Sequence, residues 1–531
     1  GGVGVGSDGI GSRSGVAAKR GGGAGTGWPQ VATPGPAAGA GRCGVTARPQ
    51  PAARSAASAH RHQRVTEGAV EASMGSDVTL VRVPHGGAAV RTPLRVAGTR
   101  ATRRRGCHRS APRRRRSRYD ARVERFDVII LGGGLLGSAT AMHLAARGVT
   151  SIAILDVDLG GRYSSSELNA GGVRATWRSE MNVALALPSI EFFESVKDEI
   201  AFDQKGYLWM YDEARWPGAV EAAAWQNQHH RLGVQTLDPA QIAAHCPYLD
   251  TLDGVAGATF SPKDGLLNPN LVKELYRREA RRLCGSGLRL ENYAYVAGID
   301  LDPDKVTVRV LKFQEFSPAG DAAIKAILCD AMPPDDAAVL NVVGDVVINC
   351  TGAWARRVAP MYGHAVPVRP VRRQIAIAHA PEVDLRPYGM FVDTSGVYFH
   401  RESTHILAGW ADPAEPTDYR FSYDGPAWFE EHVWPALAGR MSKCARMKHR
   451  SGWSGLYEYT PDLCGIIGFA PGHDRIIEAF GFTGRGAMQS WAAGRAAAEL
   501  ATARRFETID CTPLRPTRFA DGALVKESLL I

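Results

Sequence analysis

The 531-residue sequence has only nine cysteines, and their spacing fits neither a disulfide framework nor a metal site. There is no CxxC pair and no Cys/His spacing of the kind that holds zinc. These absences argue against a disulfide-stabilised secreted scaffold and against a zinc module. We therefore predict reduced thiols, an intracellular compartment and no bound metal.

A membrane-spanning helix is also lacking. The uncharged run at 128–146 has a suitable length, but it contains a glycine triplet and begins like a β-strand. This run is better interpreted as part of a nucleotide-binding unit.

Beyond residue 125 the chain has no excess of positive charge. Residues 1–125 hold 22 Arg and one Lys against six acidic side chains, whereas the rest of the chain holds 40 basic and 48 acidic ones. The formal net charge of +9 therefore comes from the N-terminal segment. The remainder is mildly acidic, which removes the main support for nucleic-acid binding.

The N-terminal segment is rich in Gly, Ala, Ser, Pro and Arg and has no long apolar periodicity. We predict a disordered leader over 1–124. From Met74 onward its composition, rich in Arg and poor in acids, is typical of an organellar transit peptide. A nuclear-type basic cluster or a misplaced start remain alternatives, since the sequence begins with Gly rather than Met.

A glycine-rich motif follows this leader, FDVIILGGGLLG at 126–137. An apolar strand precedes the glycines and a helix-like run follows them. Gly132 permits a tight turn, Gly134 allows close approach of a pyrophosphate, and Gly137 allows the helix to pack on the strand. The start of that helix would direct unpaired N–H groups at phosphates.

A second strand, SIAILD at 151–156, ends on Asp156 about 20 residues after the first glycine. A carboxylate at that place accepts hydrogen bonds from a ribose. The strand, helix and terminal acid together predict a dinucleotide-binding βαβ unit. A merely flexible glycine loop would leave all three unexplained.

Similar strand–turn units recur late in the chain, at 346–354 and 476–504. They alternate with stretches of short strands at 206–260 and 369–453. A nicotinamide dehydrogenase usually keeps its Rossmann unit contiguous, so this interleaving favours a flavoprotein. We predict an α/β fold in which an interleaved Rossmann-like FAD-binding domain accompanies an α+β substrate domain with a mostly antiparallel sheet. The predicted FAD-binding segments are 125–205, 284–365 and 454–531, and the predicted substrate-domain segments are 206–283 and 366–453.

Several stretches, in the same order, carry a resemblance to a known family: VINCTGAW at 347–354, VDTSGVYF at 392–399, WSGLYEY at 453–459, RFETID at 505–510 and TRF at 517–519. From about Phe126 to the C-terminus the chain resembles the D-amino-acid-oxidase-like FAD-dependent oxidoreductases. These include sarcosine and dimethylglycine dehydrogenases and glycine oxidase. Within the superfamily it is most similar to a mitochondrial flavoprotein associated with assembly of respiratory complex I.

The resemblance implies a set of FAD-binding positions. Ser165 and Ser166 fall in the loop near the phosphates and ribityl chain, and Val296 matches the residue whose backbone meets the adenine. The turn at 484–486 would lie beneath the pyrimidine edge of the flavin, where N–H groups at a helix N-terminus stabilise negative charge. The full implied set is Gly132, Gly134, Leu136, Gly137, Asp156, Ser165, Ser166, Val296, Thr351, Gly352, Gly484, Arg485 and Gly486. A solvated surface role for Arg485 is the alternative.

Departures from the family pattern are equally informative. Some relatives bind FAD covalently through a histidine where Asn169 stands, and others through a cysteine where Gly455 stands. Noncovalent FAD is therefore predicted. Sarcosine-oxidase-like enzymes carry a lysine that promotes the reaction with oxygen, and Tyr398 is the best match to it, which favours a dehydrogenase over an oxidase.

By the same resemblance Arg174 matches an arginine over the flavin face and is the leading catalytic candidate, with a structural ion pair as the alternative. The arginine that grips the substrate carboxylate in some amino-acid oxidases is absent near 456–457. Tyr398, Tyr457 and Trp453 could form an aromatic wall around an amine. Core packing is an equal alternative for Trp453.

The leading functional hypothesis is an FAD-dependent dehydrogenase that acts on the C–N bond of a small amine or amino acid. The alternative is a flavoprotein assembly factor for complex I, in which FAD is structural or redox-sensing. The implied partners are a substrate and either an electron acceptor or complex I assembly proteins, with no nucleic acid. The implied location is the mitochondrial matrix, with or without association with the inner membrane, and the cytoplasm is the alternative.

Overall fold

The computed structural model describes residues 122–313 and 320–527. The predicted leader at 1–124 lies outside the described residues, apart from its last three positions. The described part of the chain contains two eight-stranded sheets.

The first sheet is built around parallel strands. Its order is β17 (Ile466–Phe469), β18 (Ile476–Phe480), β11 (Ala338–Asn349), β1 (Arg122–Leu131), β2 (Ile152–Leu155) and β8 (Leu288–Glu291), with β9 (Ala294–Leu301) and β10 (Val306–Lys312) attached through β11. Strands β1, β2, β8, β11 and β18 are mutually parallel. The inner part of β1 (128–131) and the whole of β2 are continuous apolar runs, because both faces of the sheet are covered there, whereas β8 at the end of this strand order alternates apolar and charged residues.

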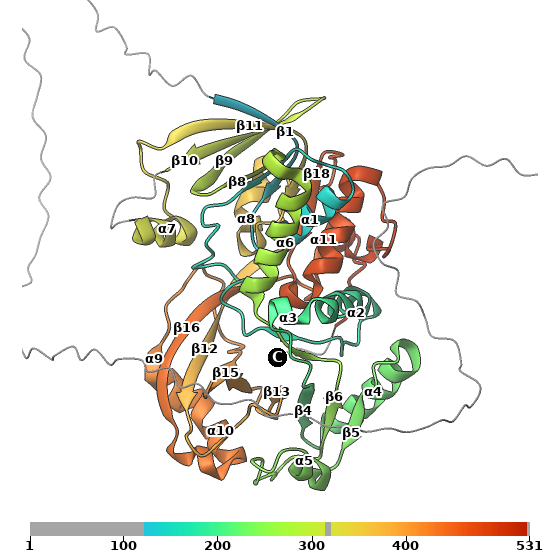
Figure 1. Cartoon of the computed structure of the whole chain (residues 1–531), viewed down its shortest axis with the longest axis vertical. Helices are drawn as coiled ribbons and strands as arrows, with labels where there is room; N and C mark the ends of the chain where they lie inside the picture. Colours follow the sequence, from blue (N-terminus) through green and yellow to red (C-terminus); the bar gives the residue numbers. More distant parts are fainter. Residues whose placement is uncertain (1–121, 314–319, 528–531) are drawn as a thin grey trace, which may run out of the picture. The chain divides into compact units, whose positions relative to one another are not determined.

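Helices α1 (Leu135–Ala146), α6 (Pro269–Cys284) and α11 (Gly486–Ala503) lie side by side beside this sheet (Figure 1). Helix α2 (Glu180–Ser195) packs on α11. Small residues let α1 and α11 approach closely: a Cβ added at Gly494 would lie 2.7 Å from the Cβ of Ala139. Two glycine turns, before α1 and before α11, thus start neighbouring helices.

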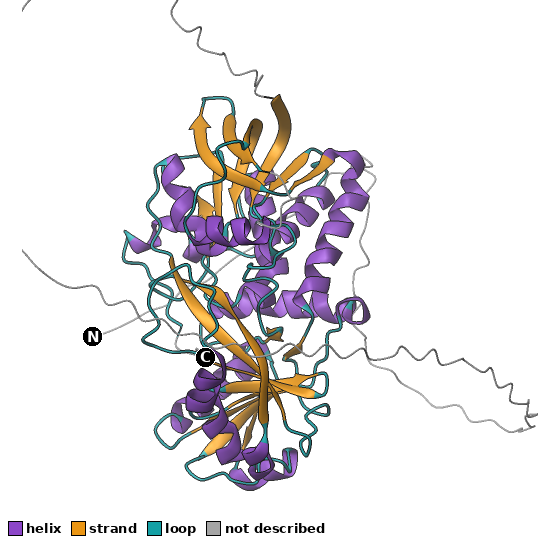
Figure 2. Cartoon of the chain, turned by 90° about the vertical axis from the view of Figure 1, so that its left-hand side faces the viewer, coloured by secondary structure: helices purple, strands orange, loops and turns teal. Residues whose placement is uncertain are grey.

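The second sheet is mostly antiparallel, as expected. Its order is β16 (Lys448–Tyr459), β12 (Arg369–His379), β15 (His405–Trp410), β14 (Tyr398–Glu402), β13 (Met390–Val392), β4 (Tyr207–Tyr211), β6 (Gly257–Ser261) and β5 (Gln235–Leu237). Only the pair β4 and β13 is parallel among the pairings of this sheet in the described ranges. The helices that accompany it include α4 (Trp216–His230), α5 (Pro239–His245) and α10 (Trp434–Arg440). Figure 2 shows the strands and helices around both sheets. The predicted fold class, an α/β FAD-binding domain with an α+β substrate domain, is confirmed.

Three local expectations need correction. Helix α6 lies almost wholly within the predicted substrate-domain segment 206–283, yet its Val272 and Tyr276 are buried in the same core as α1 and α11. Strand β16 crosses the predicted boundary at 453/454 without interruption, because it pairs with β12 along its whole length. The sequence also predicts a polar insertion from about Gln314 to Gly344, yet this segment contains α7 (Gly320–Cys329), whose Ile324 and Ile327 are buried. The other domain boundaries remain predictions.

No helix among the described residues is long and apolar enough to cross a membrane.

Candidate functional site

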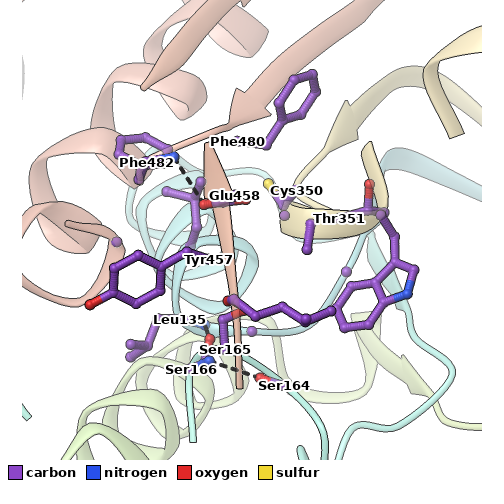
Figure 3. Close-up of a pocket in the computed structure, with 18 of the residues that line it drawn as sticks. Leu135, Ser164, Ser165, Ser166, Cys350, Thr351, Tyr457, Glu458, Phe480 and Phe482 are labelled. Atoms are coloured by element: carbon purple, nitrogen blue, oxygen red, sulfur yellow. Dashed lines mark hydrogen bonds between the residues drawn. The ribbon is translucent and has the colours of Figure 1, made fainter. Parts of the chain in front are cut away.

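One large cavity joins the two sheets, and its walls come from both of them (Figure 3). The parallel strands β1, β2, β11 and β18 end at this cavity, and the turns that follow them form one wall. Side chains of β4, β14 and the end of β16 form the other. Ligands of open α/β sheets bind at the carboxyl ends of the strands, so the location alone indicates a binding site.

The glycine turn after β1 is shaped by close backbone contacts. Gly132 has φ +93°, and a Cβ added there would lie 2.5 Å from the carbonyl oxygen of Cys350. A Cβ at Gly137 would lie 1.9 Å from the carbonyl oxygen of Gly132, so this glycine lets α1 pack against the turn. A Cβ at Gly134 would lie 2.7 Å from Ser166 Oγ, on the side that faces the cavity. At each of these three positions a different close contact therefore disfavours any residue larger than glycine.

Asp156 directly follows β2 at the cavity wall, with its carboxylate fixed by two backbone N–H groups. Gly133 N donates to Oδ2 at 2.6 Å, and Asp158 N donates to Oδ1 at 2.8 Å. The remaining lone pairs can accept hydrogen bonds from the hydroxyls of a ribose. The geometry suits the role predicted from the position at the end of the strand.

The serine loop closes over the start of α1. Ser166 Oγ accepts a hydrogen bond from Leu135 N at 2.9 Å, and Ser165 Oγ donates to the Leu456 carbonyl at 2.6 Å. Ser165 therefore links the loop to β16 in the second sheet. Of the predicted cofactor residues all except Gly137 line the cavity: Gly132, Gly134, Leu136, Asp156, Ser165, Ser166, Val296, Thr351, Gly352, Gly484, Arg485 and Gly486.

The guanidinium groups of Arg174 and Arg485 both contact the indole ring of Trp177. The guanidinium carbon of Arg174 lies 3.5 Å from the centroid of the Trp177 ring, and that of Arg485 lies 4.4 Å from it. Arg174 also contacts Trp209 at 4.6 Å. Burial and the nearby charge of Arg485 lower the pKa of Arg174 to about 10, so Arg174 remains a cation at neutral pH. Burial also lowers the pKa of Arg485.

Arg485 is not a surface residue, because only 1% of its side chain is exposed. One of its terminal nitrogens donates to the Leu463 carbonyl, while Nε and Nη2 have no hydrogen-bond partner within the described ranges. Buried unpaired donors are costly unless a ligand or an aromatic face satisfies them. The surface alternative for Arg485 is therefore wrong, and its position supports an anion or flavin edge nearby.

Three tyrosines on one face of the second sheet line the same end of the cavity: Tyr207, Tyr398 and Tyr457. No protein hydrogen bond to their hydroxyls is present among the residues that the structure describes. Burial raises the pKa of all three phenols, so each remains neutral. Trp453, in contrast, packs below them and donates to the Leu168 carbonyl at 2.9 Å, which favours the core alternative.

Sequence reasoning missed Trp177, Tyr207 and Glu458. The alternation of Tyr207 with Trp209 along β4 could have indicated a shared aromatic face. Trp177 and Glu458 were not singled out, because the contact of Trp177 with Arg485 and the position of Glu458 opposite Gly352 depend on residues more than a hundred positions away in the chain. Glu458 is a half-buried carboxyl in the cavity wall, and loss of solvation raises its pKa to about 7.

Asn169 and Gly455 occupy the places where covalent attachment occurs in some relatives. Asn169 lines the cavity, and its side-chain amide bonds to the Ser166 carbonyl and to Gly171 N. A Cβ at Gly455 would lie 3.1 Å from the Cβ of Leu168. Neither side chain can form a flavin bond, which leaves noncovalent FAD as the prediction.

These features fit a dinucleotide. The glycine turn and the start of α1 suit a pyrophosphate, Asp156 suits a ribose, and the buried donors of Arg485 suit the electron-rich edge of a flavin. Within the described ranges no group of three or more His, Cys, Asp or Glu could hold a metal ion.

Comparison with known proteins identifies the class. Residues 127–500 match the family described as FAD dependent oxidoreductase, the DAO family. The chain belongs to this family, and its cofactor is FAD. The match extends from β1 to α11 and so includes both glycine turns.

At the level of particular proteins the chain is similar to FAD-dependent oxidoreductase domain-containing protein 1 of Xenopus laevis, with 28% identity over 75% of this chain and 84% of the relative. The Bos taurus protein of the same name is also 28% identical, over 77% of this chain and 87% of the relative. Mitochondrial dimethylglycine dehydrogenase of Rattus norvegicus is 24% identical over 52% of this chain and 30% of that protein.

Among solved structures the fold is similar to L-proline dehydrogenase from P. horikoshii, with a TM-score of 0.64, 22% identity, and coverage of 76% of this chain and 99% of the other. Glycine oxidase from Geobacillus kaustophilus gives a TM-score of 0.61 at 21% identity, covering 74% and 99%. The family expectation drawn from the sequence is confirmed.

Proposed function

We propose that this flavoprotein is a dehydrogenase that oxidises the C–N bond of a small amine or amino acid. The observation that carries the proposal is the single cavity that runs from the Asp156 carboxylate to a polar, aromatic end formed by Arg174 and the three tyrosines. A structural cofactor alone would not require such an extension. The names of similar proteins, which include proline, dimethylglycine and glycine as substrates, support the chemical class.

When bound, FAD supplies the acceptor for two electrons and a proton from the substrate carbon, so that the C–N bond becomes C=N. The protein then has to hold, orient and desolvate the substrate. Tyr207, Tyr398 and Tyr457 line the cavity, and their hydroxyls can hydrogen-bond an amine, while the buried cation of Arg174 can orient an anionic group. Their burial excludes water from the reacting bond.

Electron transfer to an acceptor other than oxygen is favoured by Tyr398. This phenol stands where an oxygen-activating lysine is expected, and burial keeps it neutral. Arg174 and Arg485 supply cations at the same end of the cavity, but both are already engaged with Trp177. We further propose a mitochondrial location, in line with the mitochondrial relatives.

The test is anaerobic mixing of the full-length, FAD-loaded protein with a panel containing proline, glycine, sarcosine, dimethylglycine and simple amines. We expect at least one compound to bleach the visible absorbance of the flavin. We also expect Arg174→Gln to slow bleaching by about ten-fold or more, corresponding to ~1.4 kcal/mol at the barrier, with FAD content unchanged. A panel that leaves the absorbance unchanged would favour the alternative.

That alternative is a flavoprotein that assists assembly of respiratory complex I. It is supported by the similarity to FAD-dependent oxidoreductase domain-containing protein 1 over most of the chain. It predicts that Arg174→Gln has no effect on complex I assembly in cells lacking the endogenous protein, whereas loss of FAD abolishes it.

A further inference from the structure

Glu458 is a carboxyl in the cavity wall whose charge is not balanced by a protein cation. Its Oε1 atom accepts a hydrogen bond from Phe482 N at 3.0 Å. Its Oε2 atom is shielded from solvent and has no hydrogen-bond partner, and no ion pair involves this residue, within the described ranges. A carboxylate in such a place would be costly, whereas a neutral acid would not.

The direction of the side chain assigns Glu458 to the cofactor part of the cavity. Successive residues of a strand point to opposite faces, so Glu458 points away from its neighbour Tyr457 (Figure 3). It faces the turn after β11: a Cβ added at Gly352 would lie 3.0 Å from Oε2, and Cys350 lies beside it. That turn lines the cavity together with the glycine turn after β1.

Few charged or titratable groups face this carboxyl. From the β11 turn the only one is the Cys350 thiol, whose pKa burial raises to about 12, so it is uncharged near neutral pH. From the loop after β18, Arg485 is turned toward the Leu463 carbonyl and the Trp177 ring. On its own strand the neighbouring titratable groups are the phenols of Tyr457 and Tyr459, and burial raises the pKa of Tyr457. The pKa of Glu458 itself is raised to about 7 by loss of solvation.

We propose that Glu458 is a cofactor-binding residue that faces the bound dinucleotide as the neutral acid, so that FAD binding takes up a proton above neutral pH. The pyrophosphate of FAD is a dianion, and an ionised Glu458 without a counter-ion would repel it in a poorly solvated wall. The neutral acid can instead donate a hydrogen bond to the cofactor. The inference depends on FAD as the cofactor and not on the identity of the substrate.

The affinity for FAD should therefore fall as the pH rises above neutrality. Below about pH 7 most molecules already carry the proton, and FAD affinity is constant. Above it the proton must be supplied on binding, so the Kd for FAD rises toward ten-fold per pH unit. Glu458→Gln keeps a neutral side chain of the same shape and a donor group, so its Kd should be low and independent of pH over the same range.

The experiment titrates FAD into the cofactor-free, full-length protein between pH 6 and 8.5 and follows quenching of flavin fluorescence. Glu478→Gln is the control: Glu478 is a fully buried carboxyl on β18 whose Oε1 contacts Tyr362 and His364 and whose Oε2 has no partner within the described ranges, and it does not line the cavity. It should retain the pH dependence of the wild type. The same slope in the wild type and in Glu458→Gln would overturn the proposal.

A second measurement covers the case in which Glu458→Gln fails to fold. Wild-type protein mixed with FAD at pH 8 in weak buffer with an indicator dye should take up close to one proton per FAD bound. FAD itself has no group that titrates near neutrality. Binding without proton uptake would exclude the neutral-acid role, whereas failure of the amine panel would leave it intact.

Discussion

At single positions of this cavity there is no space for a larger side chain, and Gly134 is the clearest case. Its Cα faces Ser166 Oγ on the cavity side, and Ser166 in turn accepts from Leu135 N. A valine would displace the serine and fill the space needed by a pyrophosphate. We expect Gly134→Val to lose FAD, and since a bound ligand stabilises the native state by mass action, its Tm should fall as well.

Absorbance of the purified variant and thermal melts with added FAD measure both effects. Gly134→Ala is the graded control, because Ser166 can rotate away from a single methyl group, and it should keep part of the cofactor. A valine variant with a full complement of flavin would contradict the role assigned to the motif.

Tyr398 decides between an oxidase and a dehydrogenase in the proposed function. Its neutral phenol cannot stabilise the negative charge that builds up when oxygen takes an electron, whereas an ammonium can. We expect slow return of the flavin colour when photoreduced protein meets aerated buffer, and rapid return with a quinone or an artificial acceptor. Tyr398→Lys should accelerate the oxygen reaction by about ten-fold or more, corresponding to ~1.4 kcal/mol at the barrier.

Stopped-flow absorbance provides the rates, and Tyr398→Phe is the matched control. The phenylalanine variant removes the hydroxyl without adding a charge, so its oxygen reaction should remain as slow as that of the wild type. Equal rates for the wild type and the lysine variant would remove the support for a dehydrogenase.

At the scale of elements, the strand–glycine–helix units could be predicted because their signals are local. The strand, glycines and helix of the first unit all lie within 122–146, and those of β18 and α11 all lie within 476–503. The packing of α6 could not be predicted, because its amphipathic pattern shows a buried face but not the partner of that face. β16 runs past the expected boundary because pairing with β12 determines where it ends.

The same distinction applies to the site. Asp156 and the glycines were predictable because the end of a strand fixes their position. Arg174 and Arg485 were each predictable from a family motif, but their meeting on Trp177 depends on two loops more than 300 residues apart. Glu458 lies in the family stretch at 453–459, but the stretch gave no indication of its surroundings, which come from the β11 turn and from Phe482.

The contact between α1 and α11 offers a test at this scale. A Cβ at Gly494 would meet the Cβ of Ala139 at 2.7 Å and the backbone nitrogen of Thr140 at 2.8 Å. Both helices start at the cavity, so separating them should also disturb the site. We expect Gly494→Ala to lower the free energy of unfolding by about 1–3 kcal/mol through overpacking, although alanine is the better helix former.

Gly439, near the end of α10, is the matched control, since a Cβ there meets no atom within 4 Å. Gly439→Ala should stabilise the protein by up to about 1 kcal/mol through helix propensity alone. Urea unfolding of both variants measures the difference. A stabilising effect at Gly494 would show that the helices can separate without cost.

At the scale of the whole molecule, the cofactor connects segments that the chain order keeps far apart. The cavity is lined by turns between residues 132 and 488, and the serine loop reaches β16 through Ser165 and the Leu456 carbonyl. FAD should therefore stabilise the entire described part of the chain rather than one domain. The Tm of cofactor-free protein should rise with added FAD in a single cooperative transition.

We predict that FAD is bound noncovalently, and acid precipitation of the purified protein can test this prediction. Asn169 and Gly455 supply no nucleophile at the two attachment positions, and the Cys350 thiol in the cavity wall remains protonated because burial raises its pKa to about 12. We expect the precipitate to be colourless and the supernatant to contain all the flavin. The control is Gly455→Cys, which restores a thiol where some relatives attach FAD. Flavin that stays with the wild-type pellet would show that another side chain of the cavity forms the bond.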